Sequence, residues 1–146
     1  MTERVTKSII VKSDISRAFD VWANFESFPY FMDYVDKVTK TGPHTSHWQI
    51  AGPLGIKLGW DAETTRMDEN ERIAWNTKDG DGAITTSGEV VFSELPDGET
   101  YITVTMSYSV PGGKVGEAVG KLFSDPSARL EEDLRNYKAY IENGAV

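Results

Sequence analysis

Aromatic and methionine side chains are the residues of this chain best suited to act together, and the chemistry they offer is the binding of an apolar molecule. Large rings bury much surface, and apolar pockets that hold small ligands are built mainly from such side chains. We expect the ligand-binding residues to be Phe28, Phe31, Met32, Trp48, Trp60, Trp75, Phe92, Met106, Tyr108, Val119 and Phe123. Tyr108 and Thr64 would supply polar anchors, and a solidly packed core is the alternative.

Two carboxylates could support acid–base chemistry, because Asp61 and Glu63 lie two residues apart on a predicted strand and share one face. That face is opposite the one that carries Trp60 and Ala62, so we expect both carboxylates to be solvated. The sequence contains no Gly-x-Ser-x-Gly motif that would mark a nucleophilic serine. No catalytic residue is therefore predicted.

Metal binding is not indicated either. His44 and His47 lie three residues apart across a turn and a strand, which sends them to opposite faces. We find no nearby acid to complete a site, so we expect surface histidines. The sequence Asp79-Gly80-Asp81-Gly82 resembles the start of a calcium loop. An EF-hand would need an acid or amide at Ala83 and a glycine at Ile84, so a tight turn is predicted instead.

A glycine-rich stretch invites comparison with a phosphate-binding loop. Gly116 and Gly120 are separated by three residues instead of four, and Leu122 follows Lys121 where the loop requires serine or threonine. Nucleotide binding is therefore excluded, and no cofactor is predicted.

The composition fits one globular domain over residues 1–146. A net charge of −8 argues against nucleic acid as a partner, because phosphates would be repelled. The chain contains no cysteine, which suits the cytoplasm, and its N-terminus has no apolar run of a signal peptide. No apolar stretch approaches the roughly 20 residues needed for a transmembrane helix. The sequence leaves the oligomeric state open.

Seven strands are predicted from alternating apolar residues between turn-forming residues. They cover residues 4–12, 36–41, 47–51, 56–66, 72–78, 84–94 and 99–110. Alternation places Ile102, Val104 and Met106 on one face of the last strand, with threonines on the other. Short links between consecutive strands favour an antiparallel meander with one apolar face.

Helices are predicted at both ends of this meander. Asp14 caps a first helix whose stripe runs from Ile15 to Phe25, and a second short helix begins at Ser27. A long amphipathic helix is expected over residues 113–143, interrupted at Pro126. Its second half would anchor it to the sheet, and its glycine-rich first half would cover a cavity. Its acidic residues, including Asp133, are expected on the solvated side.

Four stretches carry a resemblance to a known family: Phe25-Glu26-Ser27-Phe28-Pro29-Tyr30-Phe31-Met32, Trp60-Asp61-Ala62-Glu63, Glu71-Arg72-Ile73-Ala74-Trp75 and Gly88-Glu89-Val90-Val91-Phe92. With the order of elements, they resemble the bacterial polyketide cyclase/dehydrase-like branch of the START-related (SRPBCC) superfamily over residues 5–141. The resemblance implies an α+β helix-grip fold. In that fold a seven-stranded antiparallel sheet curves around a long C-terminal helix, with two short helices after the first strand and a deep hydrophobic pocket.

Function transfers less directly, because superfamily members carry lipids, bind quinone-like side chains or cyclise polyketides on one scaffold. We expect a module that binds a hydrophobic or aromatic small molecule without catalysis. A polyketide cyclase or dehydratase is the alternative, with chemistry from Tyr108, Arg66 or Asp61. A third hypothesis is an interaction protein that docks on a partner through the edge of the sheet or the Phe-Pro segment. An exposed apolar patch around Phe28, Tyr30 and Phe31 would favour it.

Overall fold

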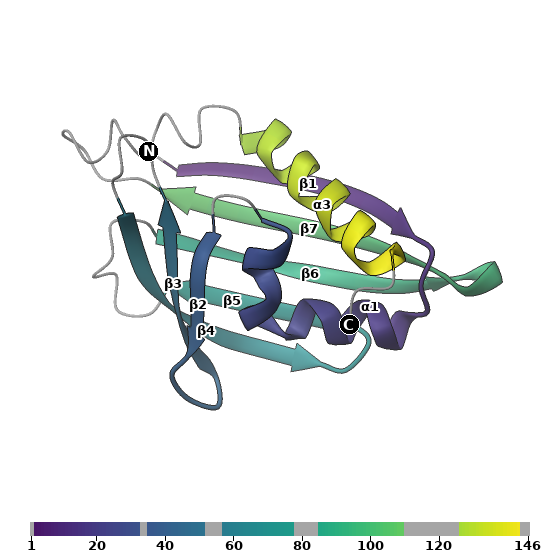
Figure 1. Cartoon of the computed structure of the whole chain (residues 1–146), viewed down its shortest axis with the longest axis horizontal. Coiled ribbons are helices and arrows are strands. Elements are labelled where there is room, and N and C mark those ends of the chain that lie inside the picture. Colours follow the sequence, from purple (N-terminus) through teal and green to yellow (C-terminus); the bar gives the residue numbers. More distant parts are fainter. Residues whose placement is uncertain (1, 33–34, 52–56, 78–84, 110–125, 144–146) are drawn as a thin grey trace.

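The chain folds into a seven-stranded antiparallel sheet with its helices on one side (Figure 1). The structure, a computed structural model, describes residues 2–32, 35–51, 57–77, 85–109 and 126–143. The strands are β1 (Thr2–Val11), β2 (Val35–Lys40), β3 (Thr45–Ala51), β4 (Lys57–Asp68), β5 (Arg72–Thr77), β6 (Thr85–Leu95) and β7 (Glu99–Ser109). Their order in the sheet is β1-β7-β6-β5-β4-β3-β2, so the first two strands of the chain form opposite edges.

The inner face of the sheet is apolar because alternating residues of paired strands fall into register. On β7, Ile102 lies opposite Phe92 of β6 and opposite Ile9 of β1. Val104 likewise lies opposite Val90, and both are buried. Since directly opposed residues share a face, these rows form one continuous apolar surface. The predicted antiparallel arrangement with one apolar face is confirmed.

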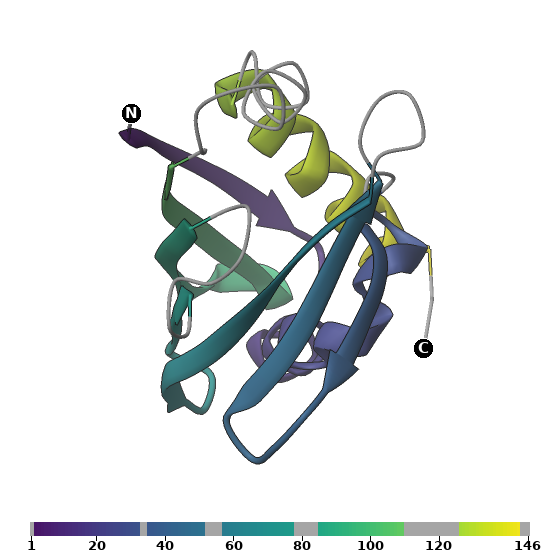
Figure 2. The same cartoon turned by 90° about the vertical axis from the view of Figure 1, so that its left-hand side faces the viewer.

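The sheet is strongly bent, and Figure 2 shows it wrapping around the helices. Two interruptions of the strand register accompany the bend, one between Thr64 and Arg66 in β4 and one between Val35 and Lys37 in β2. An extra residue in one strand increases the local twist and bends it. The curvature leaves room between the sheet and the helices that cover it.

Helix α1 (Ile15–Ala23) follows β1 directly, and its first turn is capped as predicted. The Arg17 backbone N–H donates to Asp14 Oδ1 at 2.8 Å, which satisfies one of the unpaired donors at the helix start. Phe19 and Trp22 are buried against the sheet. The helix ends two residues before Phe25, which belongs to the 3-10 helix η1 (Phe25–Tyr30).

Helix α3 (Pro126–Glu142) closes the concave side of the sheet. Its apolar stripe is buried and consists of Leu130, Leu134, Tyr137 and Ile141. The Tyr137 hydroxyl donates to the Ala18 carbonyl of α1 at 2.6 Å and so joins the two helices. The predicted first half of this helix, residues 113–125, lies outside the described residues.

Polar contacts fasten the end of α3 to β1. Lys138 Nζ donates to the Ile10 carbonyl at 2.8 Å and to Glu142 Oε2 at 2.6 Å. The same Glu142 oxygen accepts the Lys12 backbone N–H at 2.7 Å. These hydrogen bonds from Lys138 and Lys12 lower the pKa of Glu142, because they favour its charged form. Within the described part of the chain, no helix has the length and apolar character needed to cross a membrane.

Candidate functional site

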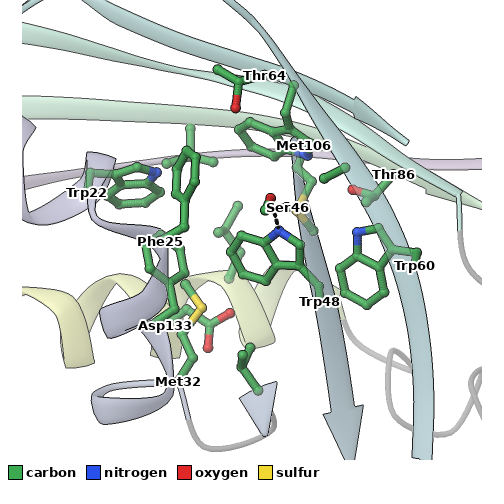
Figure 3. Close-up of a pocket in the computed structure, with 16 residues that line it drawn as sticks. Trp22, Phe25, Met32, Ser46, Trp48, Trp60, Thr64, Thr86, Met106 and Asp133 are labelled. Atoms are coloured by element: carbon green, nitrogen blue, oxygen red, sulfur yellow. Dashed lines mark hydrogen bonds between the residues drawn. The ribbon is translucent and has the colours of Figure 1, made fainter. Parts of the chain in front are cut away.

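A cavity of about 120 Å³ lies between the inner face of the sheet, the α1–η1 segment and α3 (Figure 3). Among the described residues it is lined by Trp22, Phe25, Phe28, Met32, Val35, Ser46, Trp48, Trp60, Ala62, Thr64, Trp75, Thr86, Val104, Met106, Leu130 and Asp133. Six of these side chains are aromatic. All four tryptophans of the chain are among them.

The tryptophans of β3 and β4 form one wall of the pocket. Trp48 and Trp60 are directly opposed in the sheet, and their rings stack with centroids 6.1 Å apart and planes 11° from parallel. The Trp48 indole N–H donates to Ser46 Oγ at 2.9 Å, a bond that Figure 3 shows. Trp48 also meets Phe28 of η1 edge-on at 5.2 Å. These contacts fix the ring orientation before any ligand arrives.

A glycine on β6 makes room for the third tryptophan of the sheet. Gly88 lies opposite Trp75 of β5 and opposite Met106 of β7. A Cβ atom at Gly88 would lie 3.0 Å from Trp75 Cζ2 and 2.4 Å from the Thr105 carbonyl oxygen. Any side chain there would clash, so glycine is required for the Trp75 ring to lie against this strand.

One charged side chain faces this apolar surface. Asp133 of α3 lines the pocket and is 5% exposed, and Figure 3 shows its carboxylate turned toward the interior. The prediction that Asp133 lies on the solvated side of the helix was therefore wrong. It follows Leu130 by three residues and precedes Tyr137 by four, so helical geometry places it beside the apolar stripe. The spacing alone predicts a position beside the apolar stripe, but the prediction followed the charge of the side chain instead.

Six of the predicted ligand-binding residues line the pocket, namely Phe28, Met32, Trp48, Trp60, Trp75 and Met106, as does the predicted anchor Thr64. Phe31 and Phe92 are buried elsewhere in the core. Phe31 packs on Tyr140 at 5.1 Å, and Phe92 packs on Phe19 at 5.4 Å.

Three other predicted site residues are not placed. Tyr108 lies on β7, but its side chain is not among those described, and Val119 and Phe123 lie outside the described residues.

Two of the residues considered for catalysis, Asp61 and Arg66, are turned away from the pocket. The Asp61 side chain is 59% exposed and lies 2.8 Å from His47 Nδ1. Arg66 is also exposed and pairs with Asp68. The expectation that Asp61 is solvated is confirmed, whereas the assumption that His47 has no acid nearby was wrong. Among the described residues, no cluster of three histidine or carboxylate side chains could hold a metal ion.

The exposed apolar patch that would favour docking at η1 is absent. Phe28 and Phe31 are buried, and Tyr30 is the member of this group that is exposed, at 76%. Its ring stacks on Tyr140 of α3, with centroids 6.4 Å apart. The structure therefore gives no support to docking through these three residues.

A bent antiparallel sheet closed by a C-terminal helix over an apolar pocket defines a helix-grip protein of the START type. The sequence shows the family directly: the model of polyketide cyclase/dehydrase and lipid transport proteins matches residues 11–135. The chain belongs to this family, as the sequence resemblance implied.

Individual proteins are similar to this chain over nearly its whole length. An uncharacterised 17.2 kDa protein of Streptomyces lincolnensis is 30% identical over 139 residues, which cover 95% of this chain and 89% of that protein. A crystal structure from Deinococcus radiodurans has a TM-score of 0.76 at 27% identity and covers 97% of this chain and 98% of its own. The Streptomyces aromatase/cyclase ZhuI has a TM-score of 0.75 at 16% identity with full coverage of both chains, which shows a shared fold.

Proposed function

We propose that the protein binds a small hydrophobic or aromatic molecule in the pocket between the sheet and α3, without catalysing a reaction on it. The observation that carries the proposal is the lining: six aromatic rings and two methionines surround a cavity with few polar groups. Pockets of this composition take apolar ligands, and a few polar groups orient them. The lipid transport members implied by the family description support a binding role.

The volume of the cavity fits a ligand, or part of a ligand, about the size of one aromatic ring. An apolar cavity of roughly 150 Å³ stays dry and takes up benzene. The 120 Å³ between the sheet and α3 is close to that volume. A ring held there would contact Trp48 and Trp60 on one wall and Phe28 on another.

The absence of catalysis is proposed because two of the three residues considered for chemistry, Asp61 and Arg66, lie elsewhere, while the side chain of the third, Tyr108, is not among those described. Asp61 and Arg66 are exposed on the opposite face, so neither can reach a molecule in the pocket. The role of the pocket is then to hold its ligand away from water.

The test adds one ring to the pocket wall. Ala62 of β4 lines the pocket, so Ala62→Phe should fill the cavity and abolish binding of a single-ring probe such as indole. Ala74 of β5 lies between the inward residues Ile73 and Trp75 and therefore faces the other side of the sheet. Ala74→Phe is the matched control and should bind the probe as the wild type does.

Displacement of a fluorescent hydrophobic probe measures this binding, and circular dichroism confirms that both variants are folded. Unchanged binding in folded Ala62→Phe would place the ligand elsewhere. Failure of the wild type to take up any apolar probe would refute the binding proposal itself.

A polyketide cyclase or dehydratase is the second candidate, because Asp133 places an acid–base group inside the pocket. The ZhuI structure, described as an aromatase/cyclase, shares the fold. Incubation with a linear poly-β-ketone thioester and mass spectrometry would detect loss of water. Turnover that disappears in Asp133→Asn would favour this candidate over a binding module.

A further inference from the structure

The chemical class of the ligand is inferred from the one ionisable side chain among the described residues of the pocket lining. Of the described residues that line it, Asp133 alone has an ionisable side chain. It is 5% exposed, and its neighbours in the lining include Phe25, Met32 and Leu130. A carboxylate in such surroundings loses its hydration, so partners for its oxygens are worth more there than at the surface.

We propose, on the basis of the binding function above, that the ligand carries a protonated amine that Asp133 accepts, on an aromatic or other apolar body of about one ring. The carboxylate has room for about four hydrogen bonds, so an ammonium group can join the contacts it already makes within the protein. A hydrogen bond between two charged groups is roughly twice as strong as one between neutral groups.

The aromatic walls favour the same class. Trp22, Trp48, Trp60 and Trp75 line one cavity with Phe25 and Phe28. The face of an aromatic ring attracts a cation within about 6 Å, tryptophan most strongly, and the attraction grows when water is excluded. A pocket that combines several such rings with a carboxylate acceptor stabilises positive charge from both sources, and its described lining offers an anion no cationic side chain.

The charge of the whole chain acts in the same direction. With a net charge of −8, the protein attracts cations to its surface and repels acids. The negative charge of the protein disfavours the approach of a fatty acid or another carboxylate, and it favours the approach of a protonated amine.

Three probes of similar size separate these possibilities: 2-phenylethylamine is cationic at neutral pH, 2-phenylethanol is a neutral donor, and phenylacetate is an anion. Binding is read from tryptophan fluorescence, because all four tryptophans line the pocket. We expect the amine to bind about tenfold more tightly than the alcohol, and phenylacetate to bind most weakly.

Two variants assign the preference to Asp133. Asp133→Asn removes the charge and keeps the size, and it should bring the affinities for amine and alcohol together. Glu132→Gln removes the same charge from an exposed neighbour on α3 and should leave the tenfold preference in place.

The outcomes distinguish the two proposals. If the wild type binds the alcohol as tightly as the amine, the amine class is wrong while the binding pocket stands. If neither these three probes nor any other apolar probe binds, the proposed binding function is refuted. The comparison among probes needs only the wild type, so it decides the question even where Asp133→Asn does not fold.

Discussion

Tyr137 is the residue on which the contact between the two main helices depends. Its side chain is fully buried, and its hydroxyl donates to the Ala18 carbonyl at 2.6 Å. Burial raises the pKa of Tyr137 well above its usual value of 10.0, and the nearby charge of Arg17 offsets this only in part. The group therefore stays neutral in the folded state at pH values where an unfolded tyrosine ionises.

Replacement of Tyr137 by phenylalanine should lower the free energy of unfolding by about 1 kcal/mol at neutral pH, because the hydrogen bond is lost. Above pH 10.0 the unfolded wild type gains stability by ionising this tyrosine, whereas the folded state does not. Wild-type stability then falls by about 1.4 kcal/mol per pH unit from this group, and the variant has no such loss. Urea unfolding at neutral and alkaline pH should show the difference shrinking and then reversing.

Tyr30→Phe is the control for this experiment, because Tyr30 is 76% exposed. Its stability should stay within about 0.5 kcal/mol of the wild type. A Tyr137→Phe difference that is constant across the alkaline range would contradict the proposed burial effect.

Gly88 of β6 allows the ring of Trp75, a residue of the pocket lining, to lie against the neighbouring strand. Gly88→Ala places a Cβ 2.4 Å from the Thr105 carbonyl and 3.0 Å from Trp75, so backbone and ring must both move. We expect a loss of about 1–3 kcal/mol in the free energy of unfolding, together with weaker probe binding. Ser87→Ala, at the preceding residue, should leave probe binding unchanged. Equal probe affinity in wild type and Gly88→Ala would show that Trp75 is not held by this glycine.

The sequence predicted only some of the residues that line the pocket. Trp60 and Ala62 alternate with charged residues on one strand, so strand periodicity correctly placed both on the inner face. Phe31 and Phe92 were grouped with them, because periodicity identifies a buried face without saying whether a side chain borders a cavity. Asp133 was missed because a charge at the margin of an apolar stripe is usually solvated.

Among the elements, the end of α3 depends on Glu142, whose pKa is lowered by the donors Lys138 and Lys12. A lowered folded-state pKa means that this stabilisation is present above the usual pKa of 4.5 and is lost as the pH falls through the folded-state value. Glu142→Gln should therefore cost up to about 1 kcal/mol at neutral pH, and its deficit should shrink below pH 4.5.

Chemical denaturation across the acid range measures this effect. Glu132→Gln, on the exposed side of the same helix, should show neither the deficit nor its pH dependence. A Glu142→Gln deficit that persists undiminished in acid would assign the effect to packing instead of charge.

The elements themselves were largely predictable, since turn residues punctuate the chain. The strands predicted at residues 72–78 and 99–110 correspond to β5 (Arg72–Thr77) and β7 (Glu99–Ser109). The sequence of β4 does not reveal the register shift after Thr64, because a bulge depends on how β4 pairs with β5. Periodicity predicts neither the bend of the sheet nor the volume of the pocket, and the family resemblance implied only a curved sheet with a deep hydrophobic pocket.

For the whole molecule, an unfilled apolar cavity predicts that ligands stabilise the fold. A ligand that binds the folded state alone raises the free energy of unfolding by about 2.7 kcal/mol at a concentration one hundred times its Kd. A saturating apolar probe should therefore raise the melting temperature of the wild type, measured by thermal circular dichroism. In Ala62→Phe the same probe should produce no shift. A shift of equal size in both proteins would show that the probe binds outside the pocket.

The position of β1 at the sheet edge has a consequence for synthesis. Its neighbour in the sheet is β7, and Val11 pairs with Thr100, almost ninety residues further along the chain. At translation rates of about 5–20 residues per second, the first strand waits on the order of 4–18 seconds for its partner to be made. During that interval the backbone donors and acceptors of β1 have no partner strand, so β1 can join the sheet only after β7 has been made.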